Sequence, residues 1–452
     1  MADSSENYRD KLEQIRQLLE SENPHALVRA VRDMRPADVA EMLDEFEPHE
    51  KALLFEAMSI EAAGEMLDEA DEQSQQEIIA ESEDDRVVEV LEELPPDEAA
   101  DVLGTVDEED ASKLLHQMEP DIAEQVEQLM EYPEDCAGGV MTTEIVRLQA
   151  DMTCAEAVRE TQQGSGYEGV RWPYVVDEDG KLIGFVPLHS LVFERPQTKI
   201  RDVMGKDVIS VTVDTDQEEV GNIVRRYDLN ALPVVDHDGT LIGMVTVDDV
   251  IEAMEDEVSE DMYRIAGTGE RDPLHGTLPR KVWLRLPWLI VTLLGGLLIC
   301  GIVSRFEKSI AEVVALAAFL PIIPLMGGNV AIQASTIVVR GLALGDIEHG
   351  KIMRLLAREF SVAFVLGVLC GAIAGGMAHL LYGQIVLGFV IATAVFAAVI
   401  CAALMGTLFP LVFNTLGLDP ALAAGPLVTI LNDLTSVTIY LALATLLLSE
   451  LK

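Results

Sequence analysis

The last apolar segment of the chain is long enough to cross a lipid bilayer and carries an aspartate near its middle. It covers residues 418–448, and Asp433 lies within the stretch PLVTILNDLTS at positions 426–436. A membrane helix needs about 20 apolar residues, and a charged carboxylate at its centre costs about 2.5 to 3.5 kcal/mol. Asp433 is therefore expected to face an ion path or a bundle interior. The alternative is a protonated side chain that hydrogen-bonds to a neighbouring helix.

Four further apolar segments precede this one, so five membrane spans are predicted. They cover residues 286–304, 313–339, 360–381, 386–412 and 421–448. Basic residues set the orientation of short-looped membrane proteins, with the larger number in the cytosol. One set of flanks carries Arg280, Lys281, Arg285, Arg340, Lys351, Arg354 and Arg358, whereas the other carries Arg305, Lys308 and Lys452. The pattern predicts a multi-pass protein of the cell (inner or plasma) membrane, with cytosolic N-terminal domains and an outside C-terminus.

The charge of the chain is confined to the part before the spans. The net charge is −47, and residues 283–452 contain as many basic as acidic residues, so residues 1–282 hold the whole acidic excess. This balance argues against nucleic-acid binding and makes cations the natural partners. Adaptation to high salt is an alternative source of the acidity. The scattered cysteines and the acidic N-terminus indicate a reducing compartment and no signal peptide.

Residues 9–131 are rich in Ala, Leu, Glu and Asp, which predicts helices throughout. Similar units at 36–44, 61–68 and 96–103 begin with a proline or an acid, which favours a superhelix of short helices. Asp97 and Asp101 are four residues apart, so they share a helix face and repel each other. Divalent cations are expected to stabilise such a domain, although a solvated acidic face is the alternative for any one pair.

From about residue 138 the pattern changes to short β-runs and helices, and it occurs twice. The first copy contains WPYVVDEDGKLIGFVPLHS (172–190) and the second ALPVVDHDGTLIGMVTVDD (231–249). Each predicts a strand, a tight turn, a second strand and a helix. The two copies resemble a tandem pair of cystathionine-β-synthase-type (CBS) modules. That resemblance implies binding of ATP or another adenine nucleotide through Thr246 and Asp249, where the first copy has Pro187 and Ser190. Capping of the helix by Thr246 is the alternative.

The helix after the second copy has an acidic face, and it leads to the membrane spans. Its acids at positions 249, 252, 256 and 260 recur at helical spacing, and the next basic residue is Arg264. The position between the acidic domains and the spans favours a cation-sensing strut over a merely solvated face.

The second span combines helix-breaking residues with a polar stripe. Pro321, Pro324 and the pair Gly327–Gly328 are expected to interrupt it at membrane depth. Polar residues then recur at helical spacing in both this span and the fifth, and the two stripes together predict a cation path. They comprise Asn329, Gln333, Thr336 and Arg340 in the second span, and Thr429, Asp433, Ser436 and Tyr440 in the fifth. Helix–helix hydrogen bonding is the alternative for the amides.

The order of these parts, together with GGNxxxQ at 327–333, DPAL at 419–422 and PxxTxxxD at 426–433, resembles the MgtE family of magnesium channels and transporters. The resemblance implies a homodimer in a lipid bilayer, with Mg²⁺ both transported and regulatory. It implies pore-lining roles for Asn329, Gln333, Thr336, Thr429, Asn432 and Asp433. It also implies metal binding by Asp433, Asp419, Asp97, Asp101, Asp216, Glu218, Asp228, Asp249, Glu252, Glu257, Glu260 and Asp261. The connecting helix would act as a plug.

Two residues depart from the family pattern near the ion path. Ala331 replaces the second glycine of a Gly-Asn-x-Gly-x-Gln pattern, and Ile332 stands where some members have an asparagine. These departures leave selectivity among Mg²⁺, Mn²⁺ and Co²⁺ open.

The predicted fold class is a multidomain integral membrane protein with an all-α superhelical N domain, an α/β tandem CBS pair and a five-span α-helical membrane domain. The expected boundaries are 1–135 for the N domain, 136–257 for the CBS pair, 248–282 for the connecting helix and 283–452 for the membrane domain. The leading hypothesis is channel-type Mg²⁺ influx gated by cytosolic Mg²⁺. The alternatives are an ion-coupled divalent cation carrier or exporter and a non-conducting, membrane-anchored nucleotide or Mg²⁺ sensor. The sequence contains no motif typical of an enzyme.

Overall fold

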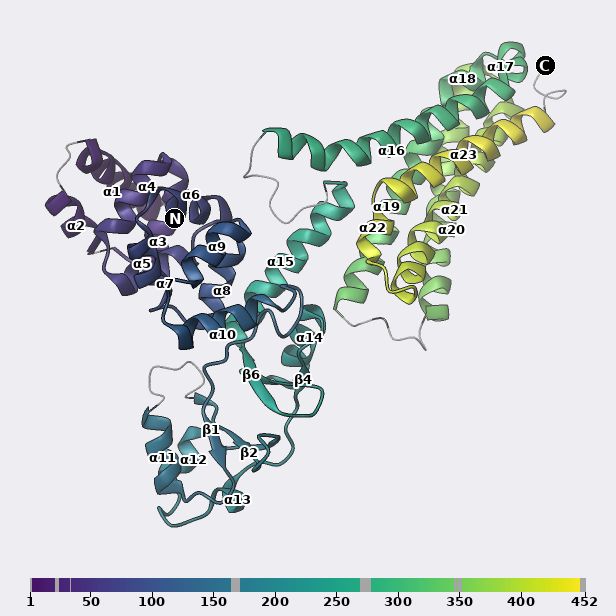
Figure 1. Cartoon of the computed structure of the whole chain (residues 1–452). Coiled ribbons are helices and arrows are strands. Elements are labelled where there is room, and N and C mark those ends of the chain that lie inside the picture. Colours follow the sequence, from purple (N-terminus) through teal and green to yellow (C-terminus); the bar gives the residue numbers. More distant parts are fainter. Residues whose placement is uncertain are drawn as a thin grey trace. The chain divides into compact units, whose positions relative to one another are not determined.

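The computed structural model describes residues 2–20, 24–32, 34–163, 171–268, 278–344, 347 and 352–447. The chain forms two compact units, Met1–Met254 and Glu255–Lys452, and each is described by itself. Figure 1 labels the helices and strands of both units. The charged positions Lys351 and Lys452, used in predicting the orientation, lie outside the described residues.

The first unit begins with an array of short helices, as the repeated units predict. Most of these helices pack on the next but one, as α3 does on α5 and α5 on α7. Many of the helices begin at a residue type that favours a helix start, namely proline, serine or aspartate. The Asp71 carboxylate, for example, accepts hydrogen bonds from the backbone of Gln73 and Ser74. The helices are α1 (Ala2–Glu20), α2 (Pro24–Arg32), α3 (Pro36–Ala40), α4 (Pro48–Ala57), α5 (Ile60–Asp68), α6 (Glu72–Glu81), α7 (Asp84–Leu91), α8 (Pro96–Gly104), α9 (Glu108–Leu115) and α10 (Pro120–Met130).

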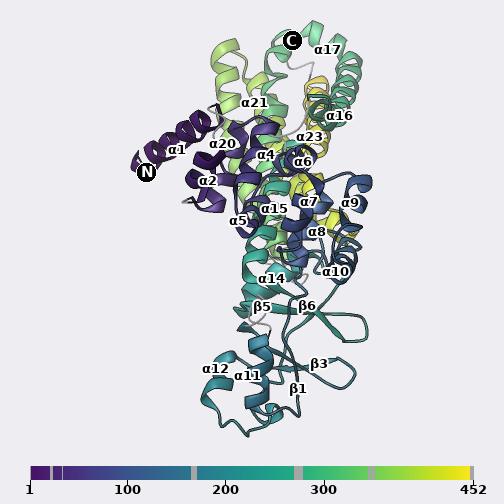
Figure 2. The ribbon, with the colours of Figure 1, turned by 60° about the vertical axis from the view of Figure 1, so that its left-hand side comes forward.

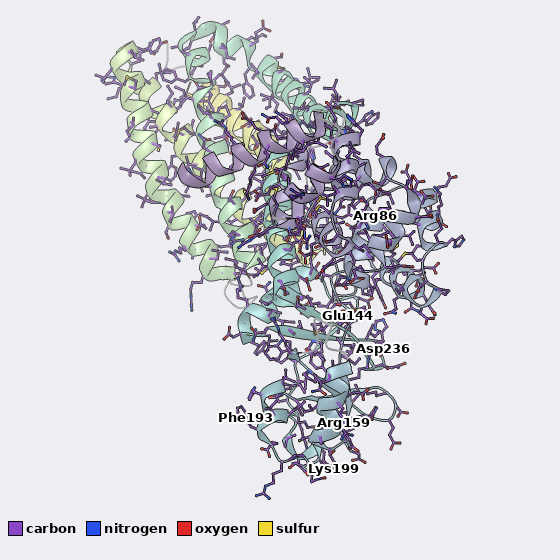
Figure 3. The ribbon with its side chains drawn as sticks, turned by 90° about the vertical axis from the view of Figure 1, so that its left-hand side faces the viewer. Arg86, Glu144, Arg159, Phe193, Lys199 and Asp236 are labelled. Atoms are coloured by element: carbon purple, nitrogen blue, oxygen red, sulfur yellow. The ribbon has the colours of Figure 1, made fainter. Side chains whose placement is uncertain are left out.

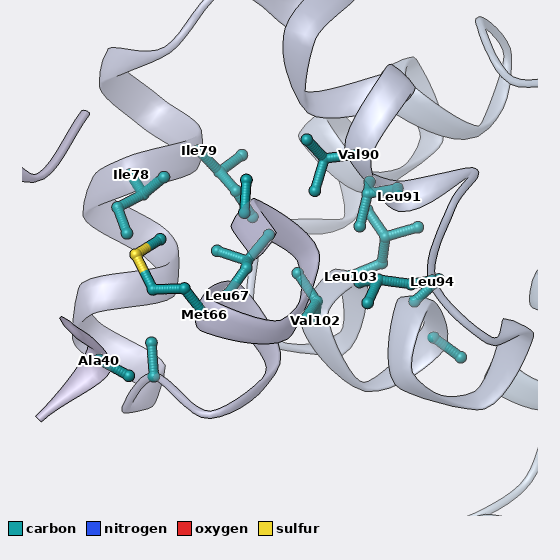
Figure 4. Packing of buried hydrophobic residues seen from close by; sticks show 14 of the residues in the cluster. Ala40, Met66, Leu67, Ile78, Ile79, Val90, Leu91, Leu94, Val102 and Leu103 are labelled. Atoms are coloured by element: carbon teal, nitrogen blue, oxygen red, sulfur yellow. The ribbon is translucent and has the colours of Figure 1, made fainter. Parts of the chain in front are cut away.

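One continuous apolar core joins these helices. Met66, Leu67, Ile78, Leu91 and Leu103 are fully buried and come from four different helices, as Figure 4 shows. Burying one such side chain contributes about 1.5 to 3 kcal/mol, so the core, rather than the acidic surface, stabilises the array.

Two three-stranded sheets follow, one in each CBS-like copy. In each sheet the first strand pairs in parallel with the second, and the second pairs antiparallel with the third. The strands are β1 (Arg147–Gln149), β2 (Tyr174–Val176), β3 (Leu182–Phe185), β4 (Val211–Thr212), β5 (Ala231–Val235) and β6 (Leu241–Thr246), with helices α11 (Cys154–Gln163), α12 (Leu188–Phe193), α13 (Ile200–Val203) and α14 (Gln217–Tyr227). Figure 3 shows Phe193 and Lys199 on the first copy and Asp236 on the second.

The two copies exchange backbone hydrogen bonds in a pseudo-twofold pattern. Thr142, which precedes the first sheet, pairs with Met244 of the second, and Gly205, which precedes the second, pairs with Phe185 of the first. The turns also meet, because the Leu182 amide donates to the Gly239 carbonyl and the Leu241 amide to the Gly180 carbonyl, both over 3.1 Å. The tandem pair is therefore one structural body, as the CBS resemblance implies.

Helix α15 (Val247–Ala266) begins in the first unit, and its residues from Glu255 onward belong to the second. In the described part of the second unit, five helical segments are long and apolar enough to cross a membrane: Leu278–Arg305, Ala315–Ala343, Ile352–Tyr382, Ile385–Thr415 and Pro420–Leu446. This number confirms the prediction of five spans.

The helices of the second unit form a bundle around α21. Helices α19, α20 and α23 pack against α21, and α16 packs against α23; Figures 1 and 2 show this arrangement. The elements are α16 (Leu278–Arg305), α17 (Glu307–Glu312), α18 (Ala315–Phe319), α19 (Ile322–Ala343), α20 (Ile352–Tyr382), α21 (Ile385–Thr415), α22 (Pro420–Ala424) and α23 (Pro426–Leu446).

The predicted interruption of the second span is only partly correct. The break falls between α18 and α19, at Leu320 and Pro321, and α19 continues as a helix through Pro324 and the pair Gly327–Gly328. Pro324 is tolerated because it lies in the first turn of α19, where backbone amides have no helical acceptor. The glycines serve close packing instead, since a Cβ atom on Gly327 would lie 2.6 Å from the Asn432 side chain.

Candidate cation site

The site lies where the short helix α22 ends and the last membrane helix, α23, begins. The Asp419 carboxylate accepts a 2.7 Å hydrogen bond from the Ala421 amide and so caps α22. The chain then turns at Gly425, and α23 begins with Pro426. Asp433 follows two turns into α23, near the middle of the apolar segment Pro420–Leu446.

Asp433 is held by its sequence neighbour. The side-chain amide of Asn432 donates to Oδ1 of Asp433 over 3.2 Å and to the Pro324 carbonyl of α19 over 3.4 Å. Its own amide oxygen accepts from the Ser436 hydroxyl over 3.3 Å. Asn432 is fully buried. It therefore fixes Asp433 relative to α19, and its pore-lining role stays a prediction.

The residues of the two predicted polar stripes differ in burial in the structure. Ser436 and Tyr440 are buried with Asn432, and the Tyr440 hydroxyl donates to the Leu316 carbonyl over 2.9 Å. These two residues therefore stabilise helix packing, and the interpretation of them as part of a cation path is wrong. On α19, Asn329, Gln333 and Thr336 are exposed on the second unit.

A cavity of about 380 Å³ lies beside Asp433. Thr429 and Asp433 of α23 face it, as do Ile332 of α19 and Thr292 of α16. The full lining is Ile265, Ala266, Thr292, Gly296, Ile299, Ile332, Gly425, Pro426, Thr429, Ile430 and Asp433. Among these described residues Asp433 is the one with a charged side chain, so a cation is the ligand that its charge favours.

The C-terminal end of α15 closes one side of this cavity. Ile265 and Ala266 line it, and the carbonyls of Arg264 and Ile265 lie 3.1 and 3.0 Å from the position of a Cβ atom on Gly425. A side chain at this turn would press on these two carbonyls, so glycine favours the close approach. The Arg264 guanidinium forms ion pairs with Glu260 on its own helix and with Asp419.

Four of the predicted metal ligands lie together where this end of α15 meets α22. Burial first, and then the nearby carboxylates of Asp419 and Glu257, raise the pKa of Asp261 to about 6. Glu260 is paired with Arg264. The structure thus brings Glu257, Glu260, Asp261 and Asp419 into one electrostatic group, with Arg264 as a cation inside it.

Asp97 is a strongly perturbed carboxyl of the first unit. Burial, together with the negative charges of Asp249 and Asp101, raises its pKa to about 8, while a hydrogen bond from Thr142 opposes the shift. Its Oδ1 is buried and has no hydrogen-bond partner. A cation would satisfy such an oxygen, and Mg²⁺ is commonly bound by one or two carboxylates while keeping several waters.

Asp101 lies in the same electrostatic environment but keeps contact with solvent. The protein around it and the charges of Asp68, Glu134 and Glu252 raise its pKa to about 7. Asp249, at the start of α15, also has a raised pKa because of its burial. Helix α8 and the first turn of α15 thus share excess negative charge, and a divalent cation would reduce their repulsion.

The other predicted ligands are more dispersed. The Asp216 carboxylate caps α14 by accepting a 2.9 Å hydrogen bond from the Glu218 amide. Asp228 ends α14 in a left-handed conformation with φ of 53°. Among the residues that the structure describes, no three acidic, histidine or cysteine side chains converge at metal-ligand distances.

The predicted nucleotide residues form a helix cap. The Thr246 amide donates to Oδ2 of Asp249 over 3.1 Å, and the Thr246 hydroxyl donates to the same oxygen over 2.6 Å. The Thr246 hydroxyl also contacts Asp248. The Asp249 carboxylate thus accepts the cap bond from the Thr246 amide, and the Thr246 hydroxyl holds that carboxylate, an arrangement close to the capping alternative but with Asp249 as the acceptor.

Sequence reasoning missed the pairing of Arg264 with Asp419, although one signal was present. Arg264 is the only basic residue of α15 and follows Glu260 by four residues, a spacing that favours an ion pair. Its second partner is 155 positions away in the chain.

Comparisons with known proteins agree with this architecture. Residues 320–443 match the divalent cation transporter family MgtE, residues 34–135 match the MgtE intracellular N domain, and residues 137–196 and 200–256 match CBS domains. The magnesium transporter MgtE of Bacillus subtilis (strain 168) is 36% identical over 324 residues, 72% of each chain. That of Thermus thermophilus is 36% identical over 327 residues, again 72% of each.

A solved structure resembles the soluble part. The cytosolic domain of the Mg²⁺ channel MgtE in complex with ATP is 34% identical, with a TM-score of 0.51, and the match covers 53% of this chain and 99% of that one.

Five apolar spans, a helical array and a CBS pair define a multidomain integral membrane transporter. The chain belongs to the MgtE family of magnesium transporters. The relatives are named for transport, which is a non-enzymatic role.

Proposed function

We propose that this protein is a channel for Mg²⁺ influx that closes when cytosolic Mg²⁺ binds to its acidic domains. The observation that carries the proposal is the position of Asp433, the charged side chain of a cavity that the end of α15 covers. An ion-attracting group next to a movable cover is the arrangement that a gated path requires.

The size of the cavity supports passage of a hydrated ion. Mg²⁺ gives up its octahedral water shell reluctantly, and six waters at about 30 Å³ each occupy about 180 Å³. The cavity of about 380 Å³ exceeds that volume. Asp433 would then hold the ion through its waters, and Thr429 would add a hydroxyl at the same wall.

The exposed polar face of α19 supports a homodimer. Asn329, Gln333 and Thr336 are exposed within a segment apolar enough to span a membrane. Polar side chains in such segments face a protein interior or a water-filled path rather than lipid. In the proposed dimer these faces and Asp433 from both protomers line one path on the twofold axis.

Gating is proposed to arise from repulsion among acids. Without Mg²⁺, the carboxylates around Asp97 repel one another within the first unit, those around Asp261 do so within the second, and α15 moves away from the cavity. With Mg²⁺ they are neutralised, and α15 stays closed. The proposed metal-binding residues are Asp97, Asp101, Asp216, Glu218, Asp228, Asp249, Glu252, Glu257, Glu260, Asp261 and Asp419, with Asp433 for the transported ion.

We also propose the topology and the domain assignment made from the sequence. The acidic N domain (1–135), the CBS pair (136–257) and the connecting helix (248–282) would lie in the cytosol, and the membrane domain (283–452) would end outside the cell membrane. The basic residues Arg340, Arg354 and Arg358 would flank the cytosolic side. This topology directs Mg²⁺ inward, down its electrochemical gradient.

A second proposed activity is binding of ATP or another adenine nucleotide at the second CBS copy. A structural relative of the soluble part carries ATP, and Thr246 and Asp249 lie together at the end of β6. Nucleotide binding would require the Thr246 hydroxyl to exchange Asp249 for the ligand.

Current recordings in planar bilayers test the channel proposal. With Mg²⁺ as the only permeant cation, we expect a voltage-dependent current that falls as Mg²⁺ rises on the cytosolic side. An ion-coupled carrier would need a second ion gradient, and a non-conducting sensor would give no current. Replacing Mg²⁺ by Mn²⁺, Co²⁺ or Ca²⁺ then measures the selectivity that Ala331 and Ile332 allow.

A further inference from the structure

Arg264 connects the end of α15 to the segment that leads into the Asp433 helix. Its guanidinium pairs with Glu260, four residues earlier, and with Asp419, which caps α22. The side chains of Arg264 and Asp419 are 31% and 22% exposed, so solvent screens this pair only in part. Arginine suits the role because its planar guanidinium can bind two carboxylates at once.

The same turn of α15 is held by close backbone packing. The Arg264 and Ile265 carbonyls lie against Gly425, and Pro426 would be 3.0 Å from a Cβ atom on Gly267, which has a φ of 76°. Ile265 and Ala266 come directly after Arg264 and line the cavity beside Asp433. Breaking the ion pair would therefore free the residues that cover the cavity.

The charges around Arg264 make it the cation on which this contact depends. Glu257, Glu260 and Asp261 share the last turns of α15 with it, and Asp419 faces them. Removing the guanidinium would increase the repulsion among these four carboxylates. Their repulsion would push the end of α15 away from α22.

We propose that the Arg264 side chain is a cation, supplied by the chain itself, that closes the path. It has a bound state and a released state. When the path is closed, it neutralises Asp419 and holds α15 over the cavity. When the path opens, it leaves Asp419, whose freed carboxylate then attracts cations to the cavity beside Asp433. This inference rests on the proposed function and adds to it a closing contact made by the chain itself, without bound metal.

Arg264→Gln tests the closing role in the full-length protein. We expect the current at low cytosolic Mg²⁺ to stay at the wild-type level, because this substitution removes no carboxylate. The cytosolic Mg²⁺ concentration that halves the current should rise about fivefold, which corresponds to about 1 kcal/mol of coupling. Arg264→Lys should shift it less. Arg159→Gln, an exposed arginine of α11, is the matched control and should leave it unchanged.

Asp419→Asn tests both states, because it removes the carboxylate that pairs with Arg264 in the closed state and attracts cations in the open state. Asparagine can still cap α22, so the local fold is kept. We expect the substitution to raise the half-closing Mg²⁺ concentration and also to lower the current at low Mg²⁺. The double variant Arg264→Gln/Asp419→Asn should shift closure no further than the larger single shift. Closure of Arg264→Gln at the wild-type Mg²⁺ concentration would overturn the proposal, as would shifts of the two variants that simply multiply.

A second measurement keeps this inference separate from the transport proposal. If the wild type passes no Mg²⁺ current, the proposed function fails, but the contact can still be tested by maleimide labelling of Ile265→Cys. We expect faster labelling in the Arg264→Gln background than in the wild-type background at the same Mg²⁺ concentration, after subtracting labelling of the native cysteines. Equal labelling rates would show that Arg264 does not hold α15 closed.

Discussion

Asn432 donates a hydrogen bond to the carboxylate of Asp433, the next residue in the chain, over 3.2 Å. Because adjacent residues of a helix point about 100° apart, one can be buried while the other faces a cavity. Asn432 is fully buried against α19, whereas Asp433 lines the cavity. The hydrogen bonds of Asn432 thus fix the Asp433 carboxylate relative to α19.

Replacing Asn432 by alanine should destabilise the membrane bundle and weaken transport. The variant loses the bonds to Asp433 and Pro324 and leaves Ser436 without its acceptor. Loss of such a buried partner costs about 1 to 3 kcal/mol. Thermal unfolding in detergent and Mg²⁺ influx measure the two effects. Thr438→Ala is the control on the same helix, since Thr438 is exposed and donates only to Leu434. Equal behaviour of the two variants would refute a positioning role for Asn432.

Gly327→Ala should impair folding or transport more than any other conservative change in α19. Its new methyl group would lie 2.6 Å from the Asn432 amide oxygen, and overpacking of this kind typically costs about 1 to 3 kcal/mol. Gly376→Ala on α20 is the matched control, because a Cβ there meets nothing within 4 Å. The yield of folded protein and the influx rate give the readout. Wild-type values for Gly327→Ala would contradict the packing described here.

These two positions show where sequence reasoning reaches its limit. A glycine pair predicts a break as readily as a close approach, and only the partner helix distinguishes the two. The predicted stripe in α23 follows steps of four and three, Thr429 to Asp433 to Ser436. In the structure the steps of four, Asn432 to Ser436 to Tyr440, form a separate buried face. Five spans, the helical repeats and the CBS pair were predictable, because each rests on a periodicity that local sequence determines.

The acidic domain should lose stability as pH rises when Mg²⁺ is absent. The folded-state pKa of Asp97 is raised to about 8, well above the usual range of an aspartate. A carboxyl with a raised pKa favours folding in its protonated form, so its contribution is fully present below about pH 4 and is lost as pH rises towards 8. Hydrogen exchange of the α8 amides, compared with and without Mg²⁺, reports the change.

Mg²⁺ should restore the protection of α8 most strongly at about pH 8.5, where the carboxylates are charged. Asp97→Asn should flatten the pH dependence, whereas Asp110→Asn, at an exposed position of α9, should not. Protection that rises between about pH 5.5 and 8.5 without Mg²⁺ would contradict the proposed repulsion.

Thr246→Val should weaken both the start of α15 and nucleotide binding. The hydroxyl bond to Asp249 is lost, which costs about 0.5 to 1.5 kcal/mol, whereas the backbone amide of residue 246 still donates to Asp249. Titration with ATP by calorimetry should show reduced affinity, whereas Ser190→Ala, at the position of the first copy that matches Asp249, should bind as the wild type does. Unchanged ATP affinity of Thr246→Val would limit this residue to its capping role.

The ion pair between Arg264 and Asp419 could not be predicted from the sequence. Its i+4 relation to Glu260 is visible in the chain, but its pairing with Asp419 depends on how α15 meets α22. The same holds for Asp97, whose burial arises from packing between distant segments. Local patterns therefore predict which residues carry charge, and only tertiary contacts decide which charges meet.

The most direct test of the central claim is Mg²⁺ influx into vesicles that contain wild-type protein or Asp433→Ala, with Asp433→Asn as the matched variant of equal size. Folded protein, verified by its gel-filtration profile, should be present in all three. We predict saturable Mg²⁺ influx in the wild type, loss of at least about 90% of it in Asp433→Ala, and a similar loss in Asp433→Asn, because the charge attracts the ion. Wild-type influx in folded Asp433→Ala would contradict the assignment of this carboxylate to the ion path.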